Sequence, residues 1–313
     1  MYVLRALTVS LSMFVLVCVA VFVAVRCGWT FFGGRDDRVR HPRWTNLLLA
    51  VQLAPVLVAS LVVAFFALPS FLRFEPRAAD EDFGVAATVL AAFGVAFLII
   101  GIVRGIRSLH RTRDVTAAWS GQPCKLHDHQ GVTAYHVHTP GVLAVTGVSR
   151  QKLFISPEIA QTLTSEELAR AVAHEMVHVR RRDNLAKLAV VLWRVPGMKQ
   201  IESAWLDAVE MTADQRAVST KAEALDLASA LVKVSRLRTQ PLPDLALGFA
   251  ANANAALSAR VERLLTYEAP TFDRRSPRIV WCGLTMLGTL ALTAFAYQPI
   301  LLQMHAFTEW LVR

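Results

Sequence analysis

Long runs of apolar residues without any charge constrain this chain most, because each run can cross a membrane as one helix. About 20 apolar residues span the hydrocarbon core of a bilayer. The runs cover residues 6–25, 47–68, 85–103 and 279–301. Hydrophobic residues make up 54% of the chain, which argues against a wholly soluble protein. The sequence therefore predicts four transmembrane helices. The first is interpreted as a retained span, because no small-residue cleavage site follows it.

The arginines between these runs predict which side of the membrane each loop faces, since basic residues in short loops stay cytoplasmic. The loop after the first run carries five arginines, whereas acidic residues outnumber arginines in the loop after the second run. More arginines follow the third run and precede the fourth. We therefore expect a multi-pass protein of the cytoplasmic (inner) membrane with both termini outside. The expected parts are three spans within residues 1–106, a cytoplasmic domain at 107–278, a fourth span at 279–301 and an outside tail at 302–313.

The net charge of +9 could suggest a nucleic-acid partner, but much of it lies at the membrane borders. Basic residues there orient the protein and meet anionic lipid. We therefore expect the lipid bilayer as a partner and no direct contact with nucleic acid. The four cysteines lie in or beside spans or on the cytoplasmic side, so no disulfide is expected.

The stretch between the third and fourth runs can hold one compact domain, and its pattern changes along the way. Short β-prone runs broken by glycine and proline cover residues 132–138, 142–146 and 152–155. After Pro157 the pattern is helical. Thr164 is followed three residues later by Glu167, which is the spacing of a capping box, so a helix should begin there.

That helix should carry His174-Glu175-Met176-Val177-His178, an HExxH motif. Side chains four residues apart are neighbours on one helical face, so the two imidazoles can bind the same ion. The glutamate between them is placed to act as a general base. The motif is typical of zinc hydrolases.

A catalytic zinc site usually has three protein ligands, so a third must come from elsewhere in the chain. Glu210 is the candidate, on a helix predicted to begin after Pro196-Gly197, where a chain reversal could return it to the histidines. Asp214, one turn later, could accept the outer N–H of a ligand histidine. Asp183, five residues past His178, is a second candidate for that role. A solvated acidic face remains the alternative for Glu210 and Asp214.

These residues together resemble the BlaR/MecR-type integral-membrane zinc metallopeptidases, which are antirepressor peptidases. The similar segments are 164–168, 174–178 with 182–185, Glu210 with Asp214 and Ala217, and 260–265. The order of three spans, protease domain and fourth span is similar as well. The resemblance implies a gluzincin-like fold in which His174, His178 and Glu210 hold one zinc ion and Glu175 is the base. It also implies cleavage of a cytoplasmic protein, a small winged-helix repressor, in signal transduction.

We therefore expect an α-helical membrane protein with an inserted cytoplasmic α+β zincin-like (gluzincin) metalloprotease domain. Members of the family that sense β-lactams carry a penicillin-binding domain after the fourth span. Only residues 302–313 follow that span here, so no such sensor is expected. Arg216, near Glu210, is a candidate to stabilise the oxyanion of the reaction. Whether the protein forms a homo-oligomer stays open.

Two other functions also stay open. One is a housekeeping zinc protease of the quality-control or prenyl-protein type, although the sequence has no span between His178 and Glu210 as those proteases would need. The other is a non-catalytic transducer whose zinc only holds the domain together, although such a site would not need Glu175. The histidines at 127–138 could hold a second metal, but solvated histidines on strands and loops are favoured.

Overall fold

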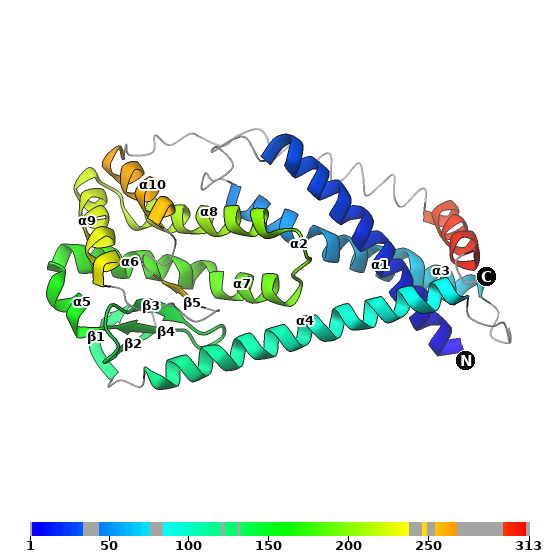
Figure 1. The fold of residues 1–313 in the computed structure, drawn as a ribbon, viewed down its shortest axis with the longest axis horizontal. Coiled ribbons are helices and arrows are strands. Elements are labelled where there is room, and N and C mark those ends of the chain that lie inside the picture. The colour runs from blue at the N-terminus through cyan, green and yellow to red at the C-terminus, as the bar shows by residue number, and fades with distance from the viewer. Residues whose placement is uncertain are drawn as a thin grey trace. The chain divides into compact units, whose positions relative to one another are not determined.

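The fold is known from a computed structural model, which describes most of the chain. The described residues are 2–33, 44–75, 84–119, 123–129, 132–237, 246–248, 254–267 and 297–310. Contacts divide the chain into two compact units (Figure 1). The first unit comprises Met1–Gly28, Leu53–Ile100 and Pro270–Arg313, and the second comprises Trp29–Gln52 and Gly101–Ala269.

Three long apolar helical segments correspond to the first three predicted spans. They are α1 (Tyr2–Gly28), which continues into the π-helical turn Trp29–Gly33; α2 (Thr45–Val62), which continues through the π-helical turn Val63–Ala67 into α3 (Leu68–Phe74); and α4 (Val85–Ala118). Each is long and apolar enough to cross a membrane, so the protein is a helical, membrane-associated one. The predicted fourth span lies outside the described residues except for its last five positions, which begin a helix over 297–310.

Helix α4 runs well past the predicted end of the third span. That span was expected to end at residue 103, before a group of arginines, but the helix continues to Ala118. Arginine ends an apolar run without ending a helix, because it is a good helix former. At about 1.5 Å per residue the helix is roughly 51 Å long, which exceeds the roughly 30 Å of a hydrocarbon core. Its polar last part therefore suits an aqueous or headgroup environment.

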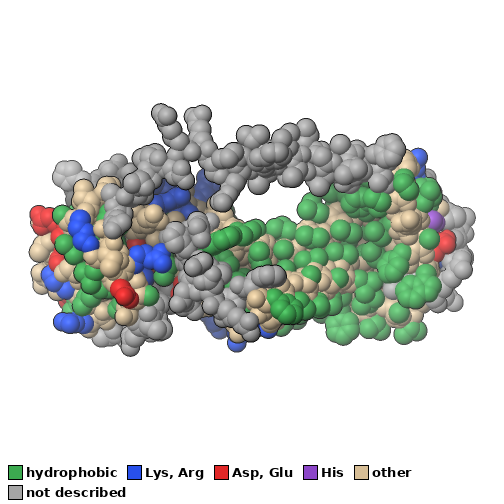
Figure 2. All heavy atoms as spheres, turned by 90° about the horizontal axis from the view of Figure 1, so that it is seen from above, with side chains coloured by type: hydrophobic (Ala, Val, Ile, Leu, Met, Phe, Trp, Pro, Cys, Tyr) green, Lys and Arg blue, Asp and Glu red, His purple; other side chains and the backbone are tan. Residues whose placement is uncertain are grey.

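Two buried hydroxyls of the first unit are paired within the unit, and many of its apolar side chains are exposed. The Ser12 hydroxyl lies 2.8 Å from the carbonyl oxygen of Ala87, and the Ser70 hydroxyl lies 2.8 Å from that of Leu301. Large apolar side chains such as Val3 are exposed, and hydrophobic atoms cover much of these helices in Figure 2. This combination suits a lipid surrounding, where unpaired polar groups are costly.

The second unit contains a five-stranded sheet in the order β1-β2-β4-β3-β5. The strands are β1 (Pro123–His129), β2 (Val132–His136), β3 (Leu143–Thr146), β4 (Lys152–Ile155) and β5 (Ala246–Gly248). Strands β2 and β4 are parallel, and the other pairs are antiparallel. The three predicted β-prone runs correspond to β2, β3 and β4, although β2 ends at His136 and so His138 lies beyond it.

Among the described residues, six α-helices lie wholly within the second unit. They are α5 (Pro157–Thr162), α6 (Ser165–Arg181), α7 (Asp183–Leu192), α8 (Lys199–Ala217), α9 (Lys221–Leu237) and α10 (Asn254–Leu265). Helix α6 contacts β3 and β5 as well as α8 and α9, so it lies at the centre of the unit. The reversal predicted at Pro196-Gly197 occurs there, with Gly197 at a φ of 91° that glycine readily adopts.

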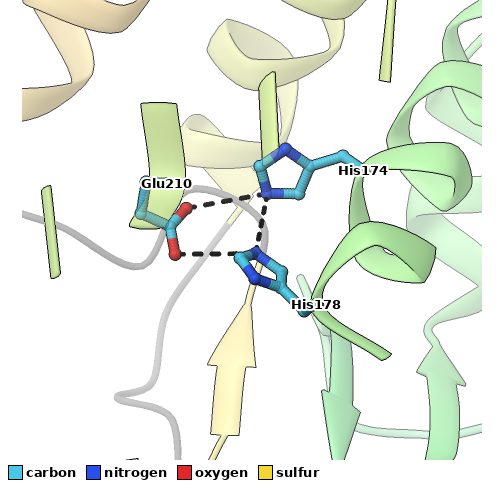
Figure 3. A group of neighbouring side chains, drawn as sticks. All are labelled: His174, His178 and Glu210. Carbon is cyan, nitrogen blue, oxygen red and sulfur yellow. Dashed lines mark hydrogen bonds and ion pairs between the residues drawn. The ribbon is translucent and has the colours of Figure 1, made fainter. Parts of the chain in front are cut away.

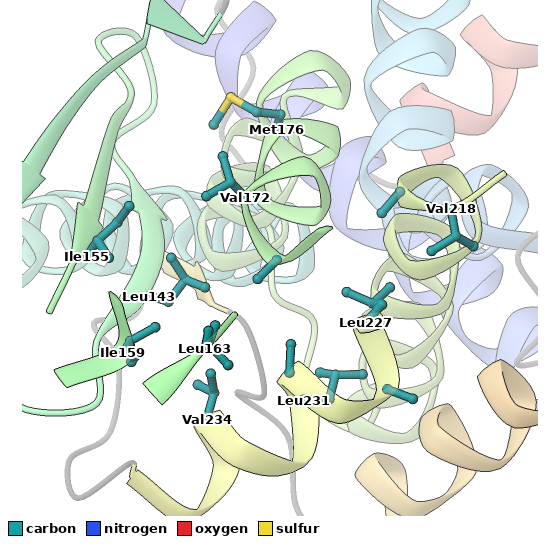
Figure 4. Close-up of a cluster of buried hydrophobic side chains, with 14 of the residues drawn as sticks. Leu143, Ile155, Ile159, Leu163, Val172, Met176, Val218, Leu227, Leu231 and Val234 are labelled. Carbon is teal, nitrogen blue, oxygen red and sulfur yellow. The ribbon is translucent and has the colours of Figure 1, made fainter. Parts of the chain in front are cut away.

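The core of the second unit forms where α6 meets the sheet and α9 (Figure 4). Val172 and Met176 from α6 pack in the same cluster as Leu143 from β3 and Leu231 from α9, and all four are at most 3% exposed. The apolar face of α6 is buried against these residues. The two histidines lie on the opposite face of α6. The packing of the apolar face therefore holds the histidine face in one orientation.

The start of α6 confirms the predicted capping box. The Thr164 side chain accepts a hydrogen bond from the Glu167 backbone N–H, and the Glu167 carboxylate accepts one from the Thr164 N–H. Glu167 also bonds Ser229 and Lys233 of α9. The same carboxylate therefore caps α6 and ties it to α9.

Candidate metal centre

Helix α6 presents His174 and His178 one turn apart on the face opposite its apolar one, and this face is buried as well. Their side chains are 0% and 1% exposed, and their Nε2 atoms lie 3.2 Å apart. The ring centroids are 4.9 Å apart with an interplanar angle of 80°. Two ring nitrogens that face each other so closely in a buried site need a shared proton or cation between them.

Glu210 of α8 brings a carboxylate to these nitrogens (Figure 3). Its Oε2 lies 3.6 Å from Nε2 of His174, and its Oε1 lies 3.7 Å from Nε2 of His178. Two ligands of a tetrahedral ion with bonds of about 2.1 Å would lie about 3.4 Å apart. The three groups are spaced as such an ion needs, and together they could hold a metal.

Each histidine also contacts an outer carboxylate through Nδ1. Oδ1 of Asp214 lies 2.9 Å from Nδ1 of His174, and Oδ2 of Asp183 lies 2.9 Å from Nδ1 of His178. A carboxylate can only accept, so with a metal bound each Nδ1 would carry the proton and each Nε2 would offer its lone pair to the metal. The structure thus brings both predicted outer carboxylates to the histidines.

Glu175 lies between the two histidines in sequence and is fully buried. Its Oε2 accepts the backbone N–H of Val145 in β3 at 2.9 Å. Its Oε1 is buried and has no hydrogen-bond partner among the described residues. Burial raises the pKa of the Glu175 carboxyl, and a raised pKa makes a carboxylate a better proton acceptor.

Arg260 of α10 is a part of the site to which the sequence assigned no role, although the segment 260–265 resembles the family. It is 2% exposed, and its Nε and Nη2 donate to Oδ2 and Oδ1 of Asp214, each at 2.7 Å. Its Nη1 donates to Oε2 of Glu210 at 2.9 Å. A signal was available: Arg260 lies in the helical phase of Leu257 and Leu264, on the apolar face of α10, and a buried arginine requires carboxylate partners.

The buried charges of the site balance one another. Burial alone would lower the pKa of His174, but the close contacts with Asp214 and Glu210 and the charge of Asp214 together outweigh it and raise the pKa to about 9. Burial alone would raise the pKa of Glu210, but the charge of Arg260 and the contacts with His174 and His178 together outweigh it and hold the pKa at about 2. Against the same effect of burial, the charge of Arg260 and the contact with His174 also lower the pKa of Asp214. Both carboxylates therefore stay ionised around the imidazole nitrogens, which favours a bound cation.

Arg216, the oxyanion candidate, does not join this cluster. It is exposed at the end of α8, while Glu210 and Asp214 are buried. Six residues of helix turn the side chain by roughly 240°, away from the face that carries Glu210. The structure therefore places Arg216 away from Glu210, and the arginine beside Glu210 is Arg260.

The histidine-rich segment shows no second site in the part of the chain that the structure describes. His136 ends β2 and His138 is exposed just after it. Neither belongs to a described group of three potential metal ligands. The side chains of His127 and His129 lie outside the described residues.

A comparison with known protein families finds a family that includes the residues of this cluster. A family model described as BlaR1 peptidase M56 matches residues 81–264, which is more than half of the chain. The match covers α4 to α10 up to Leu264 and includes every residue of the buried cluster. No curated protein matches the chain. The extent of the family match shows that the chain belongs to the BlaR1 peptidase M56 family.

Proposed function

We propose that the protein is a zinc-dependent endopeptidase in which His174, His178 and Glu210 hold the metal and Glu175 is the general base. The observation that carries the proposal is the buried group of two Nε2 atoms and one carboxylate, spaced 3.2 to 3.7 Å apart. Two imidazoles and a carboxylate with a glutamate beside them are the donor set of a catalytic zinc site. The arrangement of α6 and the small sheet supports a gluzincin-like fold.

The chain's own residues have distinct roles in this proposal. Zn²⁺, when bound, supplies Lewis-acid chemistry that polarises the scissile carbonyl and acidifies water. Glu175 takes the proton of the attacking water at Oε1, whose hydrogen-bonding capacity is unused among the described residues, and passes it to the leaving amine. Val145 fixes the other oxygen of Glu175, so the carboxylate keeps one orientation.

We further propose that the peptidase signals by cleaving a cytoplasmic protein, a small winged-helix repressor. Membership of the family and the arginine-rich loops support this assignment, with residues 107–278 on the cytoplasmic side. A housekeeping protease is disfavoured because α7, between His178 and Glu210, has only ten residues. A non-catalytic transducer is disfavoured because its metal site would not need the buried Glu175.

The metal assignment is tested by zinc analysis of the purified full chain in detergent. We expect one zinc ion per chain, and loss of that zinc in Glu210→Gln. The matched control is Glu202→Gln on the same helix, where the carboxylate bonds Arg194 outside the cluster. Zinc retained equally by both variants would contradict the ligand set.

The substrate assignment is tested by comparing cleaved cytoplasmic proteins in cells that express the wild type or Glu175→Gln. We expect a cleaved repressor fragment only with the wild type. Glu166→Gln, an exposed change in the first turn of the same helix, should leave cleavage unchanged. Cleavage products restricted to membrane or extracytoplasmic proteins would contradict the proposed orientation.

A further inference from the structure

Arg260 connects two residues that act on different parts of the metal centre. Its guanidinium makes a bidentate contact with Asp214 and a third hydrogen bond to Glu210. Oδ1 of Asp214 lies 2.9 Å from Nδ1 of His174, and Glu210 lies beside both histidine Nε2 atoms. One buried side chain is therefore in contact with a proposed ligand and with the carboxylate that orients another.

A second arginine makes a simpler version of this contact, which allows a comparison. Arg181 Nε lies 3.2 Å from Oδ1 of Asp183, whose Oδ2 bonds His178. Both histidines are thus oriented by an aspartate that an arginine holds. Arg181 is 14% exposed and contacts Asp183, whereas Arg260 is 2% exposed and bonds Glu210 as well as Asp214.

The geometry of the guanidinium is what makes the triple contact possible. Its planar fork donates two parallel hydrogen bonds to Asp214 and a third in another direction to Glu210. A lysine ammonium is a point charge on a flexible stem and cannot reproduce that fork. A glutamine would leave two buried carboxylates without their cation.

We propose that Arg260 is a positioning residue of the metal centre, which fixes Glu210 directly and His174 through Asp214. The inference rests on the proposed zinc-binding role of the cluster. It makes Arg260 responsible for two of the three ligands at once. Arg181 then positions only the third ligand, His178, through Asp183.

The test uses the full chain in detergent micelles, stripped of metal and reloaded with Zn²⁺ or Co²⁺. The variants are Arg260→Gln, Arg260→Lys and Arg181→Gln. The matched control is Arg263→Gln, an exposed arginine on the same helix α10. The readouts are zinc affinity by competition with a chelator and the visible absorption spectrum of bound Co²⁺, which reports ligand geometry in the folded protein.

We expect Arg260→Gln to weaken zinc binding by about 10- to 100-fold, as removal of such supporting groups does. The Co²⁺ spectrum should change because Glu210 and His174 are no longer held. Arg260→Lys should recover part of the affinity through its charge, while its spectrum stays altered. Arg181→Gln should have a smaller effect on both readouts, and Arg263→Gln should match the wild type.

Wild-type affinity and spectrum in Arg260→Gln would overturn the inference. Should that variant fail to fold, Arg260→Gln combined with Asp214→Asn removes the unpaired aspartate charge. The double variant should then fold and still bind zinc weakly, and wild-type affinity there would equally overturn the inference. A wild-type chain that binds no zinc would instead contradict the proposed function itself, so the two failures are distinguishable.

Discussion

Oδ2 of Asp183 lies 2.9 Å from Nδ1 of His178, although the two residues belong to different helices. Arg182 makes the contact possible. It has a φ of 55° and a ψ of 39°, a left-handed conformation that ends α6 and starts α7 at the next residue. The change of direction returns Asp183 to the last turn of α6, beside the histidine.

From this contact we predict that Asp183→Asn weakens zinc binding by about tenfold or more. The amide is neutral and accepts the His178 N–H less strongly than a carboxylate does. The measurement is zinc release to a chelator of known affinity. Asp226→Asn on α9, outside the cluster, is the control. Equal zinc release from both variants would mean that Asp183 does not support the ligand.

The capping box predicts a stability effect at the start of α6. Thr164→Ala removes the oxygen that accepts the Glu167 N–H, so the free energy of unfolding should fall by about 1 kcal/mol. Thr164→Ser keeps that oxygen and should stay close to the wild type. Thermal unfolding of the two purified variants checks this, and a stable Thr164→Ala would show that the cap is not needed.

The core between α6 and α9 predicts a larger effect. Leu231 is fully buried in the cluster of Figure 4, so Leu231→Ala should lower the free energy of unfolding by about 2–5 kcal/mol. Leu225 lies on the same helix but is 44% exposed. Leu225→Ala should therefore lower the free energy of unfolding by less. Denaturant unfolding of both variants measures the difference. Equal losses of unfolding free energy in the two variants would contradict the buried placement of the face of α9 that carries Leu231.

The raised pKa of His174 predicts how pH acts on the metal-free protein. Its pKa of about 9 in the folded protein lies above the ordinary histidine value of 6.5. Protonated His174 therefore contributes to stability in full below about pH 6.5, and this contribution is lost as the pH rises toward 9. Thermal unfolding of the stripped protein across this range measures the loss.

Zinc binding should show the opposite dependence, because the metal needs a neutral imidazole. Apparent zinc affinity should rise by about tenfold per pH unit until the pH approaches 9, with about one proton released per zinc bound. Calorimetry in buffers of different ionisation enthalpy counts that proton. Asp214→Asn should move the dependence to lower pH, and zinc affinity that is independent of pH would contradict the assignment.

Local rules were sufficient to predict the elements that carry the histidines. The Thr164–Glu167 spacing located the start of α6, and the HExxH spacing placed both histidines on one face. Short β-prone runs broken by glycine and proline predicted β2, β3 and β4. β1, by contrast, reads PCKLHDH and lacks a β-branched residue, so its pattern predicts no strand. β5 has only three residues and exists through its pairing with β3, which propensity does not reveal.

The site was harder to predict where it depends on contacts between distant segments. Asp214 was identified because it shares a helical face with Glu210. Arg260 lies 46 residues beyond Asp214, and only tertiary packing of α10 against α8 brings them together. Arg216 is close to Glu210 in sequence, but the helical phase turns its side chain to the surface. Closeness in sequence therefore does not show that two helical residues join the same site, because they can lie on different faces of the helix.

The most direct test of the account is one sample of Glu175→Gln analysed for both zinc and proteolysis. The change keeps the shape of the side chain and removes its ability to take a proton, while the three ligands stay in place. We predict one zinc ion per chain, as in the wild type, with cleavage of the cytoplasmic substrate abolished. Cleavage at the wild-type rate by this zinc-loaded variant would contradict the assignment of Glu175 as the general base and, with it, the proposed mechanism.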